Sequence, residues 1–581
     1  MPLPIPFHLK LTISTMVAVL ILSACSSPSK KPNAVPNAVP NPFNADGTGS
    51  SSNIQINTLR AFGDSYTAED YSSSRGTKNW TRELTALVPT GSIENYAVGR
   101  ALAQSGEYNS FGQQVSNWQR RGSASSSKDL SVVYFGYNDV GRFGKSEASY
   151  AASRVGYRDG VDRLVQLGAS SGNNRIFVTQ IHDWSRNPGV NNASTSQAIR
   201  DWVNFVGDVA NSHENVIAVD LYTVFNRVME NPAAFGLVNV TVANSSRSAS
   251  DFLFHDDIHF GSRGQELIAR TYRHYLTRGW EWANALSAGS SAANQLSKDI
   301  EAGALNFGNG KSINSSVRLL PLSSNGKSSA PTGLAFDIKT APLLGQSSGR
   351  MGLAYGETAR NTLRSSHSLT TDVQSNASSV YWLQPSGGFL YSAQLTQNRH
   401  RFEQRGHDDL LRSAVHNQRS ANSLGFETAL RYSFDLGPST WTPWVSLSQQ
   451  QHTLQAGTDR SLYTSDVSYR QAKVTDTYSG IGLDFELSQL PLSGGHRLAL
   501  GGGINHLRAL QRDALRLQSS EAINGIVSTE VFERGFEPRT QISLNADLVL
   551  KQQYQFGLTY RVEPEQRSTS QALELKAKIP F

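Results

Sequence analysis

The stretch Leu59-Arg60-Ala61-Phe62-Gly63-Asp64-Ser65-Tyr66 decides the fold of the first half of this chain. Its first four residues are mainly apolar and predict a buried strand, and a helical stretch follows Tyr66. A tight turn between that strand and that helix would expose the Ser65 hydroxyl at the carboxyl end of a sheet. We therefore expect the first folded domain to begin with a strand, a turn and a helix.

Apolar runs and helical stretches go on alternating to about Tyr275. The apolar runs predict buried strands at residues 130–135, 176–181 and 216–222. Apolar positions with the period of a helix predict helices at residues 150–167 and 194–210. Strands that alternate with helices form a parallel sheet covered on both faces. The sequence therefore predicts an α/β domain over residues 54–279.

The composition limits what else the chain can be. Its 581 residues exceed the length of one ordinary domain, so we expect at least two. The 53 Lys and Arg residues outnumber the 47 Asp and Glu residues, but they are scattered along the chain, which argues against nucleic acid as a partner. Charged residues make up only 17% of the chain and glycines number 48, which suits a secreted or outer-membrane protein.

The first 25 residues predict export. Lys10 precedes a mostly apolar run over residues 11–22, which is too short to span a bilayer and is typical of a signal peptide. The sequence Leu22-Ser23-Ala24-Cys25 resembles the lipobox of bacterial lipoproteins, which implies that Cys25 is lipid-modified; the alternative is an unmodified cysteine. Because Cys25 is the only cysteine, no disulfide can form within the chain.

Residues 26–53 predict a linker. Pro32, Pro36 and Pro40 recur at intervals of four residues, and Gly and Ser dominate the positions that follow. Such a composition cannot bury a core and stays extended. We expect a tether between the signal peptide and the α/β domain.

Beyond about Thr332 the apolar period changes to two. Alternating segments of this kind, separated by Gly, Ser, Asn and Asp turns, lie at residues 426–434, 481–487, 541–550, 556–562 and 573–581. Alternation over about ten residues is the signature of a membrane β-barrel, which must close because an unpaired strand edge cannot be hydrated in a bilayer. We expect a transmembrane antiparallel β-barrel over residues 321–581. A soluble all-β sandwich is the alternative.

A second short block supplies what Ser65 needs for chemistry. A serine hydroxyl is a poor nucleophile at neutral pH, so it needs a base, and the base needs a carboxylate that fixes its tautomer. The block Asp256-Asp257-Ile258-His259 can present both groups from one loop, because Asp256 lies three residues before His259. We therefore expect Ser65, His259 and Asp256 to form a catalytic set.

Negative charge that develops on a carbonyl oxygen must be met by hydrogen-bond donors. The candidates are the backbone N–H groups of Ser65 and Gly99 and the side-chain amide of Asn138, which follows a predicted strand. Glycine at position 99 lets the backbone approach a substrate closely. Asp64 and Asp139 are expected to cap a turn and to brace a loop.

Ser65, Gly99, Asn138 and His259 match, in order, the four sequence blocks of the SGNH, or GDSL, hydrolases. The resemblance covers about residues 55–280. It implies a flavodoxin-like three-layer α/β fold, Ser65 as nucleophile, His259 as base, Asp256 as its orienting acid, and no metal or other cofactor. Tyr66 departs from the family, which usually has Leu there, and we expect it to alter the pocket without touching the mechanism.

The order of signal, exported domain and C-terminal barrel resembles the autotransporters, and the whole chain resembles the esterase autotransporters of Gram-negative outer membranes. The resemblance implies a barrel of about twelve strands that the cell's barrel-insertion machinery places in the outer membrane. In that family a helix threads the barrel pore. Residues 280–320 are the expected linker, and Trp280 to Ala304 is the candidate pore helix; the alternative is a solvent-exposed interdomain helix.

These resemblances imply a surface-anchored carboxylesterase or lipase. Its expected substrates are short- to medium-chain acyl esters or lipid esters, cleaved through an acyl-serine intermediate at the outer membrane, with the hydrolase domain at the cell surface. The alternatives are an inactive adhesin or structural domain and a deacetylase of acetylated polysaccharide.

Rival motifs fit their context poorly. Residues 168–172 and 345–349 both match G-x-S-x-G, but neither lies between a strand and a helix as that motif requires. His255 and His259 have the spacing of a helical zinc site, but Asp replaces the needed Glu and the segment lacks helical character. We therefore expect no metal there.

Overall fold

The computed structural model of the chain describes residues 54–580, with gaps at residues 107, 123–124, 144–145, 191, 247–249, 307–315, 321–332, 341–348, 358–360, 365–368, 409–413, 462, 488, 535–537, 551–553 and 565–568. The expected signal peptide, Cys25, the tether at residues 26–53 and most of the second G-x-S-x-G motif lie outside the described residues. None of the helices in the described part of the chain is long and apolar enough to cross a membrane.

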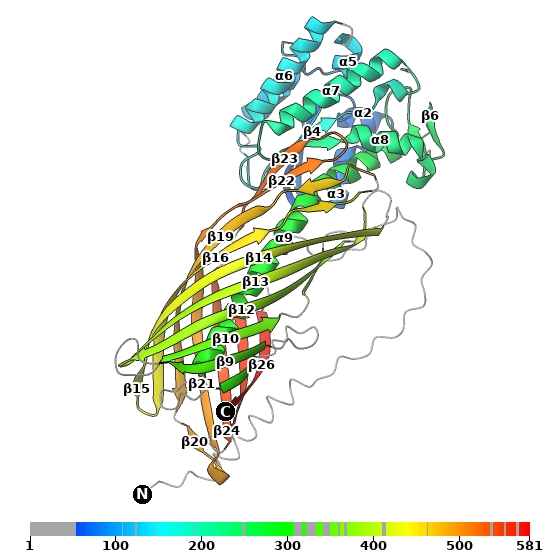
Figure 1. Cartoon of the computed structure of the whole chain (residues 1–581). Coiled ribbons are helices and arrows are strands. Elements are labelled where there is room, and N and C mark those ends of the chain that lie inside the picture. The colour runs from blue at the N-terminus through cyan, green and yellow to red at the C-terminus, as the bar shows by residue number, and fades with distance from the viewer. Residues whose placement is uncertain are drawn as a thin grey trace. The chain divides into compact units, whose positions relative to one another are not determined.

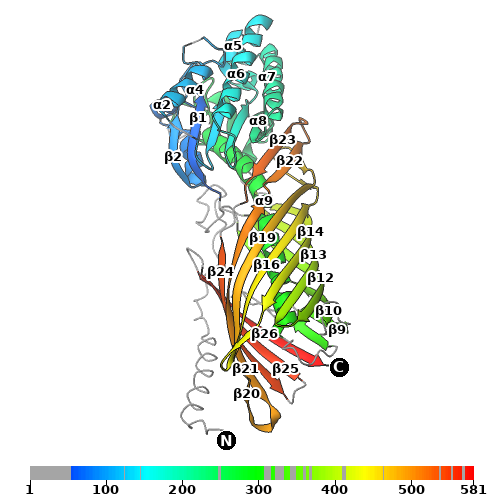
Figure 2. The same ribbon diagram turned by 90° about the vertical axis from the view of Figure 1, so that its left-hand side faces the viewer.

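The strands of the N-terminal domain form a five-stranded parallel sheet in the order β2-β1-β3-β4-β5 (Figures 1 and 2). They are β1 (Ile56–Gly63), β2 (Thr90–Asn95), β3 (Leu130–Tyr134), β4 (Arg175–Gln180) and β5 (Val216–Asp220). This is the strand order of flavodoxin-like folds, so the predicted fold class is confirmed. The sequence did not predict β2, because this edge strand is partly exposed and mostly polar.

Helices cover both faces of this sheet. α4, α6 and α7 pack together on one face, and α3, α8 and the first turns of α9 pack on the other. The helices of the domain are α2 (Glu69–Ser74), α3 (Trp80–Leu87), α4 (Phe111–Arg120), α5 (Tyr137–Phe143), α6 (Glu147–Gln166), α7 (Ala193–Asn211), α8 (Leu221–Glu230) and α9 (Ser262–Asn306).

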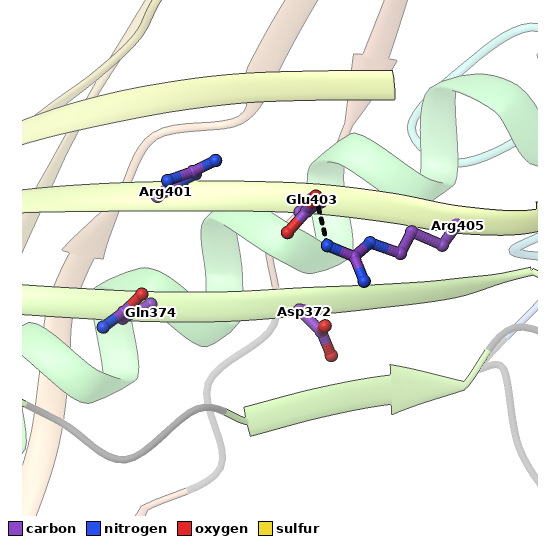
Figure 3. Close-up of a pocket in the computed structure, with 5 residues that line it drawn as sticks. All are labelled: Asp372, Gln374, Arg401, Glu403 and Arg405. Atoms are coloured by element: carbon purple, nitrogen blue, oxygen red, sulfur yellow. Dashed lines mark hydrogen bonds and ion pairs between the residues drawn. The ribbon is translucent and has the colours of Figure 1, made fainter. Parts of the chain in front are cut away.

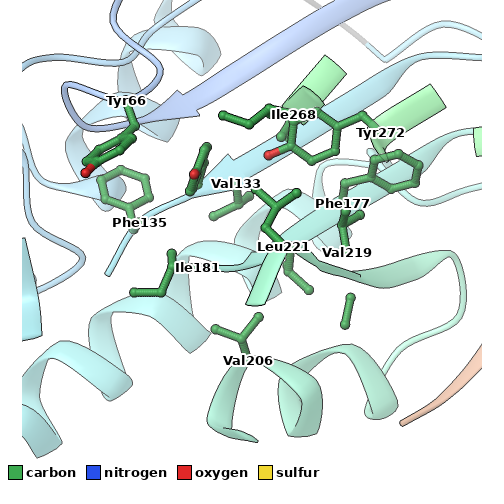
Figure 4. Close-up of a cluster of buried hydrophobic side chains, with 14 of the residues drawn as sticks. Tyr66, Val133, Phe135, Phe177, Ile181, Val206, Val219, Leu221, Ile268 and Tyr272 are labelled. Carbon is green, nitrogen blue, oxygen red and sulfur yellow. The ribbon is translucent and has the colours of Figure 1, made fainter. Parts of the chain in front are cut away.

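The core of the domain lies between these layers. Every residue of β3, β4 and β5 is buried, as expected for parallel strands covered on both faces. In the part of this core drawn in Figure 4, Val206 of α7 and Tyr272 of α9 converge on the side chains of the central strands, and the Tyr272 ring lies 6.1 Å from that of Phe177. The sheet is thereby fixed from both sides, and its carboxyl end carries the candidate site.

Twelve strands of the C-terminal region close into an antiparallel barrel. They are β8 (Ser316–Leu320), β9 (Gly333–Thr340), β10 (Gly349–Glu357), β12 (Thr370–Ser386), β13 (Phe389–His407), β14 (Ala414–Tyr432), β16 (Ser439–Leu454), β19 (Ala472–Leu487), β21 (Arg497–Arg512), β24 (Arg539–Leu550), β25 (Tyr554–Pro564) and β26 (Thr569–Pro580). Each pairs with the next, and residues 577–580 of β26 pair with β8, so these described strands form a closed ring. The predicted barrel of about twelve strands is confirmed.

Burial alternates along the barrel strands, as on β13 and β14. Residues that face the lumen are polar and buried, among them Gln394, Asn398, His400, Ser423, Gln450 and His452. Outward-facing residues in one stretch of β13, β14, β16 and β19 are apolar and exposed, among them Tyr391, Leu395, Leu424, Phe426, Val445, Leu447 and Ile481. A polar lumen inside an apolar outer band is the pattern of a transmembrane barrel, and it is not that of a soluble sandwich.

α9 links the two parts of the chain. Its 45 residues begin in the α/β domain and end against the inner face of the barrel, where the Ser290 hydroxyl lies 3.0 Å from His452 Nε2 and 3.1 Å from an Asp476 carboxylate oxygen. Gly289 fits closely there, since a Cβ atom would lie 3.2 Å from the His400 ring.

Two expected boundaries differ from the elements observed. The boundary at residues 279–280 falls inside α9, because residues 262–306 contain no proline that would end the helix. The barrel begins with β8 at Ser316, ahead of the expected residue 321, because a strand of five residues is too short to reveal its alternation in the sequence.

A hairpin from the barrel region packs on the edge of the parallel sheet. It belongs to a small sheet of β17 (Gly457–Asp459), β18 (Val467–Tyr469), β22 (Leu515–Glu521) and β23 (Val527–Phe532). The backbone N–H of Asn215 donates to the Thr529 carbonyl at 2.8 Å. Arg175 Nε lies 3.4 Å from a Glu530 carboxylate oxygen, and both side chains are only 2% exposed. A second buried pair, Arg278 with Glu521 at 3.0 Å, joins α9 to the same hairpin.

We expect Glu530→Ala to weaken this contact strongly. Removing one partner of a buried ion pair leaves the other charge uncompensated and costs about 3–5 kcal/mol. The thermal unfolding midpoint of the α/β domain, followed by tryptophan fluorescence, is expected to fall by on the order of 10 °C. Glu533→Ala is the matched control, because this exposed side chain lies on the loop after β23. Equal midpoints for the two variants would show that the buried pair does not hold the domain.

Candidate active site

Ser65 lies in the turn that follows β1, at the carboxyl end of the sheet. Glycine is required at the start of this turn, since a Cβ atom on Gly63 would lie 2.7–2.8 Å from Thr67 and from the Tyr134 carbonyl. Asp64 caps the turn as predicted: its carboxylate accepts from the Tyr66 backbone N–H at 3.0 Å. Burial raises the pKa of Asp64 to about 8, which fits a structural rather than a catalytic carboxyl group.

The structure brings Ser65, His259 and Asp256 together. His259 Nε2 lies 2.9 Å from Ser65 Oγ, and His259 Nδ1 lies 2.9 and 3.0 Å from the two carboxylate oxygens of Asp256. Because a carboxylate can only accept, Nδ1–H donates to Asp256, and Nε2 is left to accept from the serine hydroxyl. This is the arrangement of a nucleophile, a base and the acid that orients the base.

The loop between β7 (Phe252–Phe254) and α9 holds the base in place. An Asp256 carboxylate oxygen accepts from the backbone N–H groups of Ile258 at 3.0 Å and His259 at 2.7 Å. Partial burial by itself raises the pKa of Asp256, but the hydrogen bonds from the His259 side chain and from these two N–H groups outweigh it and hold that pKa well below its usual range. Asp256 therefore stays ionised beside the imidazole across the neutral range.

Asp256 also has a partner that the sequence analysis missed. Arg75 Nε donates to its second carboxylate oxygen at 3.0 Å, and the Arg75 guanidinium lies 3.6 Å from the centroid of the Tyr71 ring. The Tyr71 ring in turn lies 4.6 Å from the His259 ring. Tyr71 lies within the short helix α2 and Arg75 directly follows it, and no motif marks either residue. Only the position of α2 directly after the nucleophile could have suggested them.

Of the two remaining oxyanion candidates, Gly99 lies on a loop and Asn138 lies in the first turn of α5. The backbone N–H of Val98, next to Gly99, donates to the Gly63 carbonyl at 3.2 Å. A Cβ atom on Gly99 would lie 3.5 Å from the Tyr71 ring. Asn138 Nδ2 donates to the Ala101 carbonyl at 3.0 Å, which holds its amide against the loop that carries Gly99. An amide NH₂ group has two N–H donors, so the second can donate to an oxyanion.

Asp139 braces this same loop, as predicted. Its two carboxylate oxygens accept from the Ala103 backbone N–H at 3.0 and 3.1 Å. Burial raises the pKa of Asp139 to about 6.

Tyr66 supports the loop that carries the base. It is only 3% exposed, and its ring stacks on that of Tyr137 at 4.0 Å and lies 5.2 Å from the His259 ring. Its hydroxyl donates to the Ile258 carbonyl and accepts from Asn187 Nδ2 at 3.1 Å. A phenol thus reaches the loop behind the base, which the usual leucine could not do. The expectation that Tyr66 alters the pocket stays a prediction.

Residues 59–271 match the model of the GDSL-like lipase/acylhydrolase family. The chain carries a GDSL-like lipase/acylhydrolase domain. The match runs from β1 into α9 and includes Ser65, Gly99, Asn138 and His259. In the described residues of the chain, no three His, Cys, Asp or Glu side chains gather as metal ligands.

Solved structures are similar to parts of this chain. The translocator domain of the autotransporter NalP from Neisseria meningitidis is 12% identical, covers 50% of this chain and 98% of its own, and gives a TM-score of 0.38. The β domain of the Bordetella autotransporter BrkA is 13% identical over 46% and 99%, with a TM-score of 0.33. The native M. smegmatis aryl esterase is 15% identical over 38% and 99%, with a TM-score of 0.24. No curated protein matches the chain.

We expect Tyr66→Phe to slow ester hydrolysis without unfolding the GDSL-like domain. Losing the hydroxyl removes two hydrogen bonds behind His259, each worth about 0.5–1.5 kcal/mol. The change loosens the loop that presents the base, so kcat is expected to fall roughly threefold to tenfold with KM nearly unchanged. The measurement is the steady-state hydrolysis of a p-nitrophenyl ester.

Tyr150→Phe is the control for this experiment. The Tyr150 hydroxyl donates to the Ala198 carbonyl at 2.6 Å between α6 and α7, so the variant loses a comparable bond elsewhere in the domain. Its kcat is expected to match that of the wild type. Equal kcat values for all three proteins would mean that Tyr66 does not support the base.

Proposed function

We propose that the GDSL-like domain is a serine carboxylesterase or lipase that cleaves short- to medium-chain acyl esters or lipid esters. The observation that carries the proposal is the chain of hydrogen bonds from Ser65 through His259 to Asp256. A serine hydroxyl within 2.9 Å of an imidazole nitrogen, whose other nitrogen is held by an ionised carboxylate, can be deprotonated as it attacks. An inactive adhesin would have no need to keep this geometry.

The first half of the reaction forms an acyl-serine. Ser65 Oγ attacks the ester carbonyl carbon while His259 Nε2 takes the hydroxyl proton, and Asp256 stabilises the imidazolium. The carbonyl oxygen becomes an oxyanion and accepts hydrogen bonds from the N–H groups of Ser65 and Gly99 and from the Asn138 amide. When the intermediate collapses, the C–O bond to the alcohol breaks, and His259 returns the proton to the departing alcohol.

The second half repeats these steps with water. His259 takes a proton from the water as its oxygen attacks the acyl carbon, and the same donors stabilise the new oxyanion. Collapse breaks the bond to Ser65 Oγ, which regains its proton from His259 and releases the acid. Arg75 is a positioning residue in this scheme, because its guanidinium holds the Asp256 carboxylate that orients His259.

We propose further that the barrel holds this esterase in the bacterial outer membrane, with the GDSL-like domain at the cell surface. The apolar outer band and the polar lumen support a membrane setting. The buried pairs between the hairpin and the domain support a fixed attachment at one end of the barrel. Cys25 would add a lipid anchor, and the barrel-insertion machinery would place the chain in the membrane.

The proposed activity predicts a graded response to acyl length that depends on Ser65. Wild type, assayed on p-nitrophenyl esters of increasing chain length, is expected to turn over the short and medium members. Ser65→Ala is expected to lose on the order of 10⁶-fold in kcat. Equal turnover by both proteins would refute Ser65 as the nucleophile, and no turnover by the wild type on any ester would favour the adhesin. Release of acetate from acetylated polysaccharide alone would point to a deacetylase.

The oxyanion role of Asn138 makes a separate prediction. Asn138→Ala removes one donor aimed at charge that appears only in the transition state, so kcat is expected to fall by about 10²–10³-fold with KM nearly unchanged. Thermal unfolding checks that the loop after Gly99 survives the loss of the bond to Ala101. A rise in KM with kcat intact would instead assign Asn138 to substrate binding.

A further inference from the structure

The outward-facing residues of β12, β13 and β14 change from apolar to polar and charged along the strands. Leu395 of β13 pairs with Val380 of β12 and with Phe426 of β14, and these three outward-facing side chains are 49%, 43% and 52% exposed. They form an upper row of the apolar band. Beyond them, towards the end of the strands that faces the α/β domain, the outward positions of β13 are Gln397, Arg399, Arg401, Glu403 and Arg405.

The first arginine lies close above the edge of the apolar band. Arg399 is four residues beyond Leu395, which is about 14 Å along a strand and about 10 Å in height for a strand tilted as barrel strands are. Lipid headgroups occupy a layer of about 5–7 Å outside the hydrocarbon on each side. Arginine side chains bend towards that layer while their stems stay on apolar surface. The guanidinium group of Arg399 can therefore reach headgroup level, and Arg401 is the next outward-facing residue above it on β13.

A pocket of about 180 Å³ opens between these strands. Figure 3 shows Asp372 and Gln374 of β12 facing Arg401, Glu403 and Arg405 of β13, which together line it. Its two carboxylates already have partners. Glu403 accepts from Arg405 at 2.5 Å and lies 2.8 Å from His416 Nε2, and Asp372 accepts from the Thr362 hydroxyl at 2.6 Å.

Among the described residues, Arg399 and Arg401, unlike Arg405, have no carboxylate partner at this site. Within the described part of the chain, neither Arg399 nor Arg401 makes a hydrogen bond or an ion pair with another residue. Both side chains are exposed and point outward. The site thus holds three arginines but only two carboxylates, Asp372 and Glu403. The arginines without an ion-pair partner in the described residues, Arg399 and Arg401, lie on the side nearest the apolar band. Guanidinium groups bind phosphate through paired N–H donors, and they do so more strongly where water is partly excluded.

We propose that Arg399, Arg401 and the adjoining pocket form a binding site for the phosphate group of an anionic glycolipid of the outer leaflet. The lipid's acyl chains would lie against the apolar row of Val380, Leu395 and Phe426, and its phosphate would lie between the two guanidinium groups. This placement favours a lipid over a soluble anion, because a soluble anion would use the cations but not the apolar row below them. The site depends on the membrane setting of the barrel and not on the esterase chemistry.

Native mass spectrometry of the full chain in detergent tests this site. The probe is a bis-phosphorylated glucosamine-disaccharide lipid, added alongside its dephosphorylated form and, separately, inorganic phosphate. Wild type is expected to retain the phosphorylated lipid, and Arg399→Ala/Arg401→Ala is expected to retain it at least about tenfold more weakly, since two charge-assisted contacts are lost. The dephosphorylated lipid is expected to bind both proteins equally weakly.

The control is Arg497→Ala, which removes an exposed arginine at the start of β21, at the opposite end of the barrel strands, and is expected to retain the lipid as the wild type does. Hydrolysis of a soluble ester and heat-modifiable migration of the barrel are expected to be unchanged in all variants. Equal retention by wild type and the double variant, or equal retention of both lipid forms, would overturn the proposal. Binding of inorganic phosphate as tight as that of the lipid would overturn the lipid assignment.

Discussion

The hydrogen bond between His259 Nε2 and Ser65 Oγ is the interaction on which the site depends, and it joins residues 194 positions apart in the sequence. The parallel sheet fixes one partner, because Ser65 follows β1, which is paired on both sides by β2 and β3. The loop after β7 fixes the other, through the Asp256 carboxylate that accepts from its backbone. Tyr66 joins the two sides directly, since it neighbours Ser65 and its hydroxyl bonds the Ile258 carbonyl.

The same loop couples the site to the barrel. α9 begins at Ser262, three residues after His259, and continues without a break to the lumen, where the Ser290 hydroxyl bonds His452 and Asp476. The hairpin of β22 and β23 fixes the domain a second time through buried ion pairs. α9 enters the barrel lumen, and the β22–β23 hairpin bonds both the sheet edge and α9. Both contacts hold the α/β domain to the barrel. The candidate catalytic groups therefore lie in the domain that these contacts hold.

Much of this arrangement could be predicted from the sequence, because it depends on local patterns. Four of the five strands of the parallel sheet are apolar runs, and Ser65, Asp256 and His259 stand in short motifs after or between such runs. The alternation of the barrel strands likewise follows from one face meeting lipid and the other meeting water.

The features that the sequence did not reveal depend on tertiary contacts. Arg75 and Tyr71 matter only because α2 folds back beside His259, and nothing in their spacing shows it. β2 is a polar edge strand, and its place is set by pairing with β1. Arg401 lies on β13, for which the sequence analysis predicted no alternating segment. Its proposed role in lipid binding depends on its distance from the apolar band, which the sequence does not give.

The central claim is that Ser65 is the nucleophile that His259 activates. The most direct measurement is to incubate the full chain with a p-nitrophenyl alkylphosphonate, which stops at a covalent phosphonyl-enzyme, and to locate the added mass by peptide mass spectrometry. The account predicts one adduct, on the peptide containing Ser65, with a rate of formation that falls steeply in His259→Ala. An adduct on another residue, or ester hydrolysis that persists in a protein whose Ser65 is unmodified, would contradict it.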